Sequence, residues 1–193
     1  MNKKTDINKK LNEIDKKSKT YKNLQTAFAG EAQARVRYQF FASQAKKEGY
    51  IHISNIFTQT SDNEKEHAEI WFKLLYNHSI PPTTKDLLIS INNEKYEWDT
   101  MYKEFAKDAL NEGYESIANL FENVGEIEKS HQQRFESLLK QIEEDTIFKS
   151  TKEVYWWCTN CGTLIKGKKP PLLCPVCSHP QGYFVQKDIK ISE

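Results

Sequence analysis

The sequence is poor in glycine and proline and contains no long apolar run. Seven glycines and six prolines among 193 residues are too few for a many-turned β-sandwich or a low-complexity chain. No apolar stretch approaches the roughly 20 residues that span a bilayer, and the lysine-rich start lacks the apolar segment of a signal peptide. We therefore expect a soluble, cytoplasmic protein with no membrane partner.

A large net charge is also missing, although the charges are unevenly distributed. The formal net charge is +1, which argues against a general nucleic-acid binder. Residues 1–22 hold eight lysines against three acidic residues, residues 23–149 carry a net charge of −7, and residues 150–193 carry +3. The basic start could attract an acidic partner, but a solvated N-terminal arm is the simpler interpretation.

Residues 23–149 have the periodicity of amphipathic helices. Apolar residues recur at alternating steps of three and four over residues 24–45, 53–74 and 117–142, and a fourth helix is predicted from about Asn92 to Leu110. Residues 76–91, with Pro81 and Pro82, are predicted to form a long crossover. The expected fold class is mainly α, a ferritin-like four-helix bundle with a long crossover, followed by a small four-cysteine metal domain.

The helical region repeats itself at an offset of 64 residues. Glu48-Gly49-Tyr50 recurs as Glu112-Gly113-Tyr114, and the pair Glu64 and His67 recurs as Glu128 and His131. We interpret each repeat as a helical hairpin that turns at Glu-Gly-Tyr. Two such hairpins are expected to form a bundle with pseudo-twofold symmetry.

Carboxylates and histidines interrupt the apolar faces of the predicted helices. They are Glu31 on the first helix, the pairs Glu64–His67 and Glu128–His131, and Glu94 and Glu97 at the start of the fourth helix. A Glu-x-x-His pair places both side chains on one helix face, and burying so many ionisable groups is costly unless cations lie among them. One Glu from each of two helices and Glu-x-x-His from each of the others is a di-iron or di-manganese arrangement. Oxygen-rich ligands with two histidines favour iron or manganese.

Two further features of the repeat concern this predicted site. Tyr38 and Tyr102 occupy equivalent positions and could hydrogen-bond to carboxylates or peroxide, or could simply pack in the core. Glu31 has no partner at an offset of 64, because Lys95 stands there and the carboxylate is Glu94. This shift suggests a local irregularity, such as a π-bulge, in the helix that carries Glu94.

All four cysteines lie near the end of the chain in two C-x-x-C motifs. Cys158 and Cys161 are separated by twelve residues from Cys174 and Cys177. This pattern is typical of a tetrahedral four-thiolate metal site, whereas two disulfides would suit a secreted chain. The spacing alone does not separate zinc from iron. The predicted domains are a basic arm at 1–20, the bundle at 21–148 and the four-cysteine domain at 152–193.

Taken together, these motifs resemble the rubrerythrin family, in which a ferritin-like di-iron domain precedes a rubredoxin-like domain. The resemblance covers about Leu24 to Lys187. It rests on Gly30-Glu31 with Arg35 and Tyr38, the two Glu-x-x-His pairs, Asn93-Glu94-x-x-Glu97 with Met101-Tyr102, and the cysteines. It implies two irons held by Glu31, Glu64, His67, Glu94, Glu97, Glu128 and His131, and one iron held by Cys158, Cys161, Cys174 and Cys177. Ser178 stands where free rubredoxins usually have glycine.

The resemblance implies a peroxidase that reduces hydrogen peroxide to water in oxidative-stress defence. Its catalytic residues would be Glu97, His67, Tyr38 and Tyr102, with Glu97 and His67 as alternative ligands to one iron. Electrons would enter through the four-cysteine iron from an NAD(P)H-dependent reductase or a rubredoxin, within a head-to-tail homodimer. The alternatives are a ferroxidase that uses the same carboxylates and a binding module with zinc among the cysteines.

Overall fold

The computed structural model describes residues 14–187. Most of the predicted basic arm at 1–20 and the end of the predicted four-cysteine domain at 188–193 therefore lie outside the described residues. The chain divides into two units, Met1–Pro81 and Pro82–Glu193, and each is described by itself. Within residues 14–187, none of the helices is long and apolar enough to cross a bilayer.

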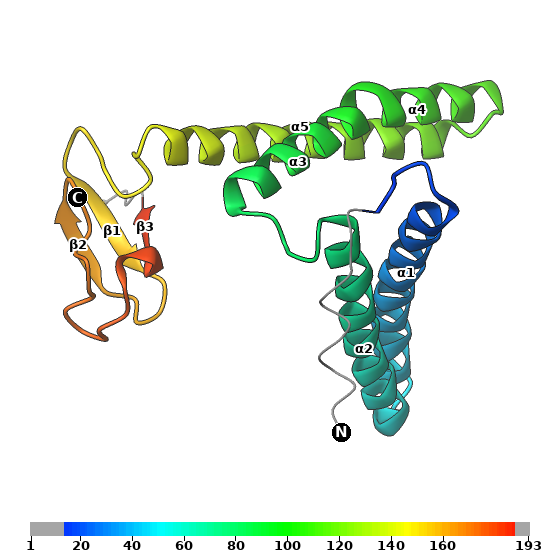
Figure 1. The fold of residues 1–193 in the computed structure, drawn as a ribbon, viewed down its shortest axis with the longest axis horizontal. Coiled ribbons are helices and arrows are strands. Elements are labelled where there is room, and N and C mark those ends of the chain that lie inside the picture. The colour runs from blue at the N-terminus through cyan, green and yellow to red at the C-terminus, as the bar shows by residue number, and fades with distance from the viewer. Residues whose placement is uncertain (1–13, 188–193) are drawn as a thin grey trace. The chain divides into compact units, whose positions relative to one another are not determined.

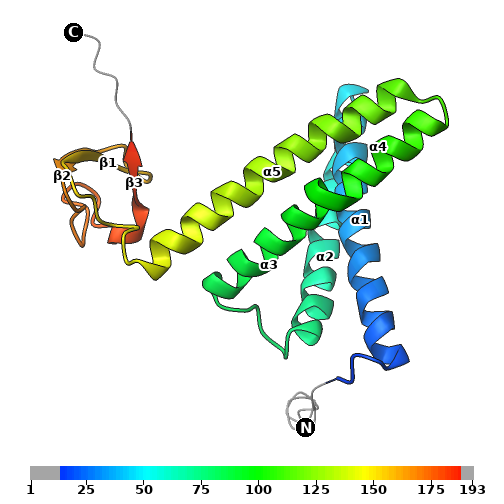
Figure 2. The same cartoon turned by 90° about the horizontal axis from the view of Figure 1, so that it is seen from above.

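The first unit is a helical hairpin of α1 (Lys19–Lys47) and α2 (Ile51–Leu75), which lie side by side (Figures 1 and 2). The Ser18 hydroxyl caps α1 by accepting a hydrogen bond from the Tyr21 backbone N–H at 3.0 Å. The turn is a Schellman motif, since the Tyr50 N–H donates to the Ala45 carbonyl and the Gly49 N–H to that of Lys46. Gly49 has a φ of 85°, a conformation that glycine adopts without steric cost.

Two serines of α2 fix how the first hairpin packs. The Ser54 hydroxyl donates to the Ala42 carbonyl at 2.8 Å, and the Ser61 hydroxyl donates to the Arg35 carbonyl at 2.9 Å. Both serines are buried, with Ser61 only 1% exposed. A buried hydroxyl is tolerated where it finds an acceptor, so these bonds set the register of α1 against α2.

The second unit begins with a helix that starts earlier than the helix predicted from about Asn92. α3 (Thr83–Tyr96) starts directly after Pro82, whose carbonyl accepts from the N–H groups of Lys85 and Asp86. The predicted crossover at 76–91 is therefore wrong in its second half, and the connection ends at Pro82. Proline has a backbone angle suited to a helix start and lacks an N–H that the first turn would leave unpaired. The two prolines thus precede a helix rather than lie within a long loop.

The predicted irregularity near Glu94 is confirmed. α3 continues into η2 (Glu97–Met101), a π-helical turn, and then into α4 (Tyr102–Asn111). The extra residue of a π-turn explains why Glu94 matches Glu31 at an offset of 63, whereas Tyr102 matches Tyr38 at 64. A second Schellman turn at Gly113, with a φ of 86°, leads into α5 (Glu115–Glu143).

The two hairpins share aromatic packing but differ in their polar contacts. Ring centroids of Tyr38 and Phe57 lie 6.0 Å apart, and those of the repeat partners Tyr102 and Phe121 lie at the same distance. By contrast, α5 has Ala118 and Gly125 where α2 has Ser54 and Ser61, so both interhelical hydroxyl bonds are absent from the described second hairpin. The repeat therefore preserves shape more closely than hydrogen bonding.

The end of the chain forms a small three-stranded antiparallel sheet in the order β2-β1-β3. The strands are β1 (Val154–Cys158), β2 (Leu164–Gly167) and β3 (Phe184–Lys187), with the short helix η3 (Gln181–Tyr183) before β3. Trp156 and Phe184 are buried beside two of the cysteines, and the Trp156 indole donates to the Gly167 carbonyl at 3.0 Å. The predicted fold class, mainly α with a small C-terminal four-cysteine domain, is confirmed.

Ser61→Ala is expected to lower the free energy of unfolding of the metal-free protein by about 1 kcal/mol, because it removes one buried hydrogen bond between α1 and α2. Urea denaturation followed by circular dichroism measures the change. Ser137→Ala is the control, since Ser137 is exposed on α5 and its loss is expected to stay within about 0.5 kcal/mol. Equal effects of the two substitutions would contradict the assigned role of Ser61.

Candidate metal centres

The first hairpin brings together three of the predicted ligands. One ligand atom from each of Glu31, Glu64 and His67 lies within 4.8 Å of the others. His67 Nδ1 is 2.8 Å from a Glu64 carboxylate oxygen and 3.9 Å from one of Glu31. The i,i+3 spacing on α2 places the imidazole and the Glu64 carboxylate on one helix face, and α1 supplies the second carboxylate.

The second hairpin builds the matching cluster from Glu94, Glu128 and His131, which also meet within 4.8 Å. His131 Nδ1 lies 2.7 Å from Glu128 and 3.6 Å from Glu94. Glu94 Oε2 is buried and has no hydrogen-bond partner among the described residues. Because a buried carboxylate oxygen without a partner is costly, this atom fits a bound cation. The oxygen-rich donor set suits iron or manganese.

Glu97 and Tyr102 lie outside this three-residue group but within its electrostatic influence. Burial, followed by repulsion from Glu128, raises the pKa of Glu97. Burial raises the pKa of the Tyr102 phenol, with further contributions from Glu97 and Glu128. The pKa of Glu94 is also raised, first by burial and then by its hydrogen bond with Glu128. Several carboxylates thus compete for protons at one place, a pattern typical of functional sites.

Tyr38 packs against other aromatic side chains of the first hairpin. Its ring lies against Phe41 and Phe57, at centroid distances of 6.3 Å and 6.0 Å. Tyr102 makes the equivalent contacts with Phe105 and Phe121. The packing interpretation of these tyrosines is therefore supported by the structure, whereas their role toward peroxide stays a prediction.

The four cysteines form the third candidate centre. Their sulfur atoms all lie within 4.8 Å of one another, with Cys158 Sγ 3.7 Å from Cys177 Sγ and Cys161 Sγ 3.6 Å from Cys174 Sγ. Disulfide sulfurs would lie at about 2.05 Å. Sulfurs bound to one metal at about 2.3 Å in a tetrahedron lie about 3.8 Å apart, so the spacing fits a four-thiolate metal and not two disulfides.

Both C-x-x-C motifs fold alike although only one is followed by glycine. The Gly162 N–H donates to the Cys158 carbonyl, and the Ser178 N–H donates to that of Cys174. Gly162 and Ser178 both have a positive φ, 80° and 59°, so serine adopts the left-handed turn in place of glycine. The backbone N–H of His179, the main cause, lowers the pKa of the Cys177 thiol to about 6, which favours the thiolate that binds metal.

Trp98, Gln132 and Gly125 belong to no sequence motif, yet they meet across the second hairpin. The Trp98 indole donates to the Gln132 side chain across the hairpin. Their signal in the sequence is a break in the repeat, because Ala68 and Ser61 stand at the positions of Gln132 and Gly125. A polar residue or a glycine that replaces its repeat partner within a helix marks a contact that the other hairpin lacks.

Two protein-family models match this chain. Residues 22–139 match the family described as Rubrerythrin, with a second match over 85–159, and residues 156–185 match the "Rubrerythrin, rubredoxin-like domain" family.

Three curated relatives are similar along nearly their whole length. Rubrerythrin-1 of Clostridium acetobutylicum is 42% identical, over 88% of this chain and 94% of its own. Rubrerythrin of Porphyromonas gingivalis is 44% identical over 94% of each chain, and that of Nitratidesulfovibrio vulgaris is 41% identical, over 88% of this chain and 94% of its own. The chain thus carries the carboxylate and histidine groups of a di-iron site and the four cysteines of a rubredoxin-like iron centre.

Glu97→Gln is expected to make the metal-free protein more stable at neutral pH and less sensitive to pH. Because the folded-state pKa of Glu97 lies above its ordinary value of 4.5, the native state binds this proton more tightly than the unfolded state. Stability therefore falls as pH rises from about 4.5 through the folded-state pKa. Urea denaturation between pH 4 and 8 tests the change of slope.

Asp99→Asn is the control with the opposite sign. The hydrogen bond and charge of Lys103 lower the pKa of Asp99, so its ionised form stabilises the fold above its ordinary pKa and this stability is lost as pH falls. The variant is expected to be slightly less stable at neutral pH. A Glu97→Gln variant that followed the wild-type pH slope would contradict the assigned environment of Glu97.

Proposed function

Because the chain belongs to the rubrerythrin family, we propose that it is a non-haem di-iron peroxidase that reduces hydrogen peroxide to water in defence against oxidative stress. The observation that carries the proposal is the pair of matched Glu-Glu-His clusters, one in each hairpin, with a buried carboxylate oxygen that lacks a partner among the described residues. The proposed domains are the bundle at 21–148 and the rubredoxin-like domain at 152–193.

The proposed ligands follow from the two clusters and their neighbour on η2. Two irons would be held by Glu31, Glu64, His67, Glu94, Glu97, Glu128 and His131, and a third by Cys158, Cys161, Cys174 and Cys177. Each histidine Nδ1 faces the carboxylate three residues before it. Both side chains of each pair therefore already lie together, and little rearrangement would be needed for them to hold a cation.

The chain's own residues would supply orientation and protons for the reaction. Reduction of one peroxide to two waters consumes two electrons and two protons. When bound, two ferrous ions supply one electron each and act as Lewis acids toward oxygen. The Glu97 carboxyl, whose pKa is raised by burial and by Glu128, holds its proton to a higher pH than an ordinary glutamate does. The Tyr102 phenol, kept protonated by a raised pKa, can donate a hydrogen bond to an oxygen.

Electrons would return through the four-cysteine centre. A four-thiolate iron is oxidised and reduced by one electron at a time, which suits reduction of a two-electron site in two steps. The donor in this proposal is a separate NAD(P)H-dependent reductase or a rubredoxin. The proposed assembly is a head-to-tail homodimer, in which one subunit's thiolate-bound iron serves its partner, and the proposed location is the cytoplasm.

The iron-reconstituted, reduced protein is expected to be oxidised faster by peroxide than by oxygen. Glu97→Ala and His67→Ala are expected to slow the peroxide reaction by about 10-fold or more, as loss of a metal's direct or supporting partner does. Stopped-flow absorbance measures the rates. Glu104→Ala and His52→Ala are matched controls, because both residues are exposed and lie outside the clusters. Faster oxidation by oxygen with formation of a mineral would favour the ferroxidase.

Metal analysis of protein purified from its own source separates electron transfer from a zinc-binding role. We expect about three irons per chain and a visible ferric-thiolate absorption that Cys174→Ser abolishes and Thr159→Ala, outside the four sulfurs, retains. Zinc among the four cysteines would overturn the electron-entry role, since zinc has no redox chemistry.

A further inference from the structure

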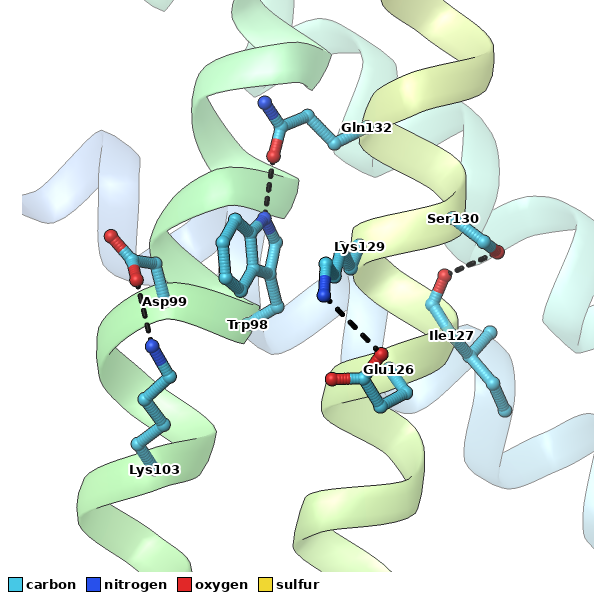
Figure 3. Close-up of polar contacts among 8 residues, drawn as sticks. All are labelled: Trp98, Asp99, Lys103, Glu126, Ile127, Lys129, Ser130 and Gln132. Atoms are coloured by element: carbon cyan, nitrogen blue, oxygen red, sulfur yellow. Dashed lines mark hydrogen bonds and ion pairs between the residues drawn. The ribbon is translucent and has the colours of Figure 1, made fainter.

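The π-helical turn η2 is tied to α5 by one side-chain hydrogen bond beside the second cluster. The Trp98 indole N–H donates to Gln132 Oε1 at 2.5 Å (Figure 3). Gln132 Nε2 donates onward to Glu136 at 2.7 Å. Trp98 directly follows Glu97 in the sequence, and Gln132 directly follows His131. The bond therefore joins the immediate neighbours of two proposed ligands.

Lysines on both helices hold the indole ring in place. Lys103 Nζ lies 5.0 Å from the Trp98 ring centroid and Lys129 Nζ lies 5.3 Å from it, distances at which a cation is attracted to an aromatic face. Each lysine is itself paired, Lys103 with Asp99 at 2.8 Å and Lys129 with Glu126 at 3.6 Å (Figure 3). The ring is thus oriented by contacts from α4 and α5.

α5 approaches η2 and α4 closely beside the Trp98–Gln132 bond. A Cβ added to Gly125 would lie 3.4 Å from the Tyr102 Cβ and 4.0 Å from the Trp98 Cα. The first hairpin fixes its equivalent crossing by the bond from Ser61 to the Arg35 carbonyl. Gly125 has no hydroxyl, and Ala68 stands where the second hairpin has Gln132. The Trp98–Gln132 bond therefore replaces a contact that the second hairpin lacks.

The Trp98–Gln132 bond matters because the position of the π-turn η2 decides which way the neighbouring side chains point. A π-turn holds one residue more than the α-helix, and one residue corresponds to a rotation of about 100° about the helix axis. If the extra residue moved along the helix past Glu97, that side chain would turn away from Glu128. A bond anchored at Trp98, the second residue of η2, opposes this movement.

We propose that Trp98 and Gln132 are positioning residues, which lock the π-turn in register and thereby hold Glu97 toward Glu128. The inference deepens the proposed function, since it takes Glu97 as a metal ligand. Its tests use no peroxide, so a protein without peroxidase activity would still confirm or overturn it.

Hydrogen exchange of the metal-free, full-length protein tests the lock itself. Trp98→Phe keeps the ring but removes the donor, and Gln132→Met removes the acceptor. Each is expected to speed exchange of the amides at 97–102 by about 2- to 10-fold, the effect of losing one neutral hydrogen bond. The double variant is expected to match the larger single effect, because both changes break the same bond. Ser130→Ala, which removes only a bond to the Ile127 carbonyl of its own helix, is expected to leave exchange unchanged.

Manganese binding tests whether the lock acts through Glu97. Mn(II) prefers carboxylates to thiolates, and its electron paramagnetic resonance signal reports both affinity and ligand geometry. Trp98→Phe is expected to weaken Mn(II) binding by about 10-fold and alter the bound signal, whereas in a Glu97→Ala background it should change neither. The proposal would be overturned if amide exchange were unchanged in both single variants, or if their effects on exchange added in the double variant. It would also be overturned if Trp98→Phe weakened Mn(II) binding as strongly in the Glu97→Ala background as in the wild-type protein.

Discussion

Repulsion among carboxylates that share one face of a helical hairpin is the constraint on which the site depends. Burial, followed by interactions with Glu128, raises the pKa of both Glu94 and Glu97, and Glu94 keeps one oxygen without a partner among the described residues. Without a cation this arrangement costs free energy. The stable core and turns of the hairpin must therefore offset a locally unfavourable cluster, which is the expected signature of a site built for metal.

The two hairpins have the same arrangement of helices but are stabilised by different contacts. Both use the same glycine turn, the same aromatic triad and the same Glu-x-x-His pair. The first aligns its helices by serine hydroxyls on backbone carbonyls. The second has small residues there, a π-turn, and an indole bonded to an amide. The asymmetry lies beside Glu97, the one proposed carboxylate ligand with no counterpart in the first hairpin, where Gln33 stands at an offset of 64 and Ala34 at an offset of 63.

The sequence predicted whatever repeats with a period or a fixed spacing. The helices, the Glu-Gly-Tyr turns, the three-residue clusters and the four-cysteine site follow from such patterns, and even the π-turn follows from the shift between Glu94 and Lys95. The start of α3 does not follow from the sequence, because Pro81 and Pro82 suit a loop as well as the start of a helix. The Trp98–Gln132 bond does not follow from the sequence, because no spacing rule joins residues on different helices. Only the folded hairpin brings these two side chains together.

The Schellman turns at Gly49 and Gly113 bear on how the chain folds. Each turn places two helices beside each other over short sequence separations, so most contacts within a hairpin are local. Local contacts favour rapid folding, and each hairpin can therefore close from its glycine outward before a metal ion arrives. The cluster of ionisable groups would then be the last part of each hairpin to be stabilised, because the charges of its carboxylates are balanced only when a cation binds.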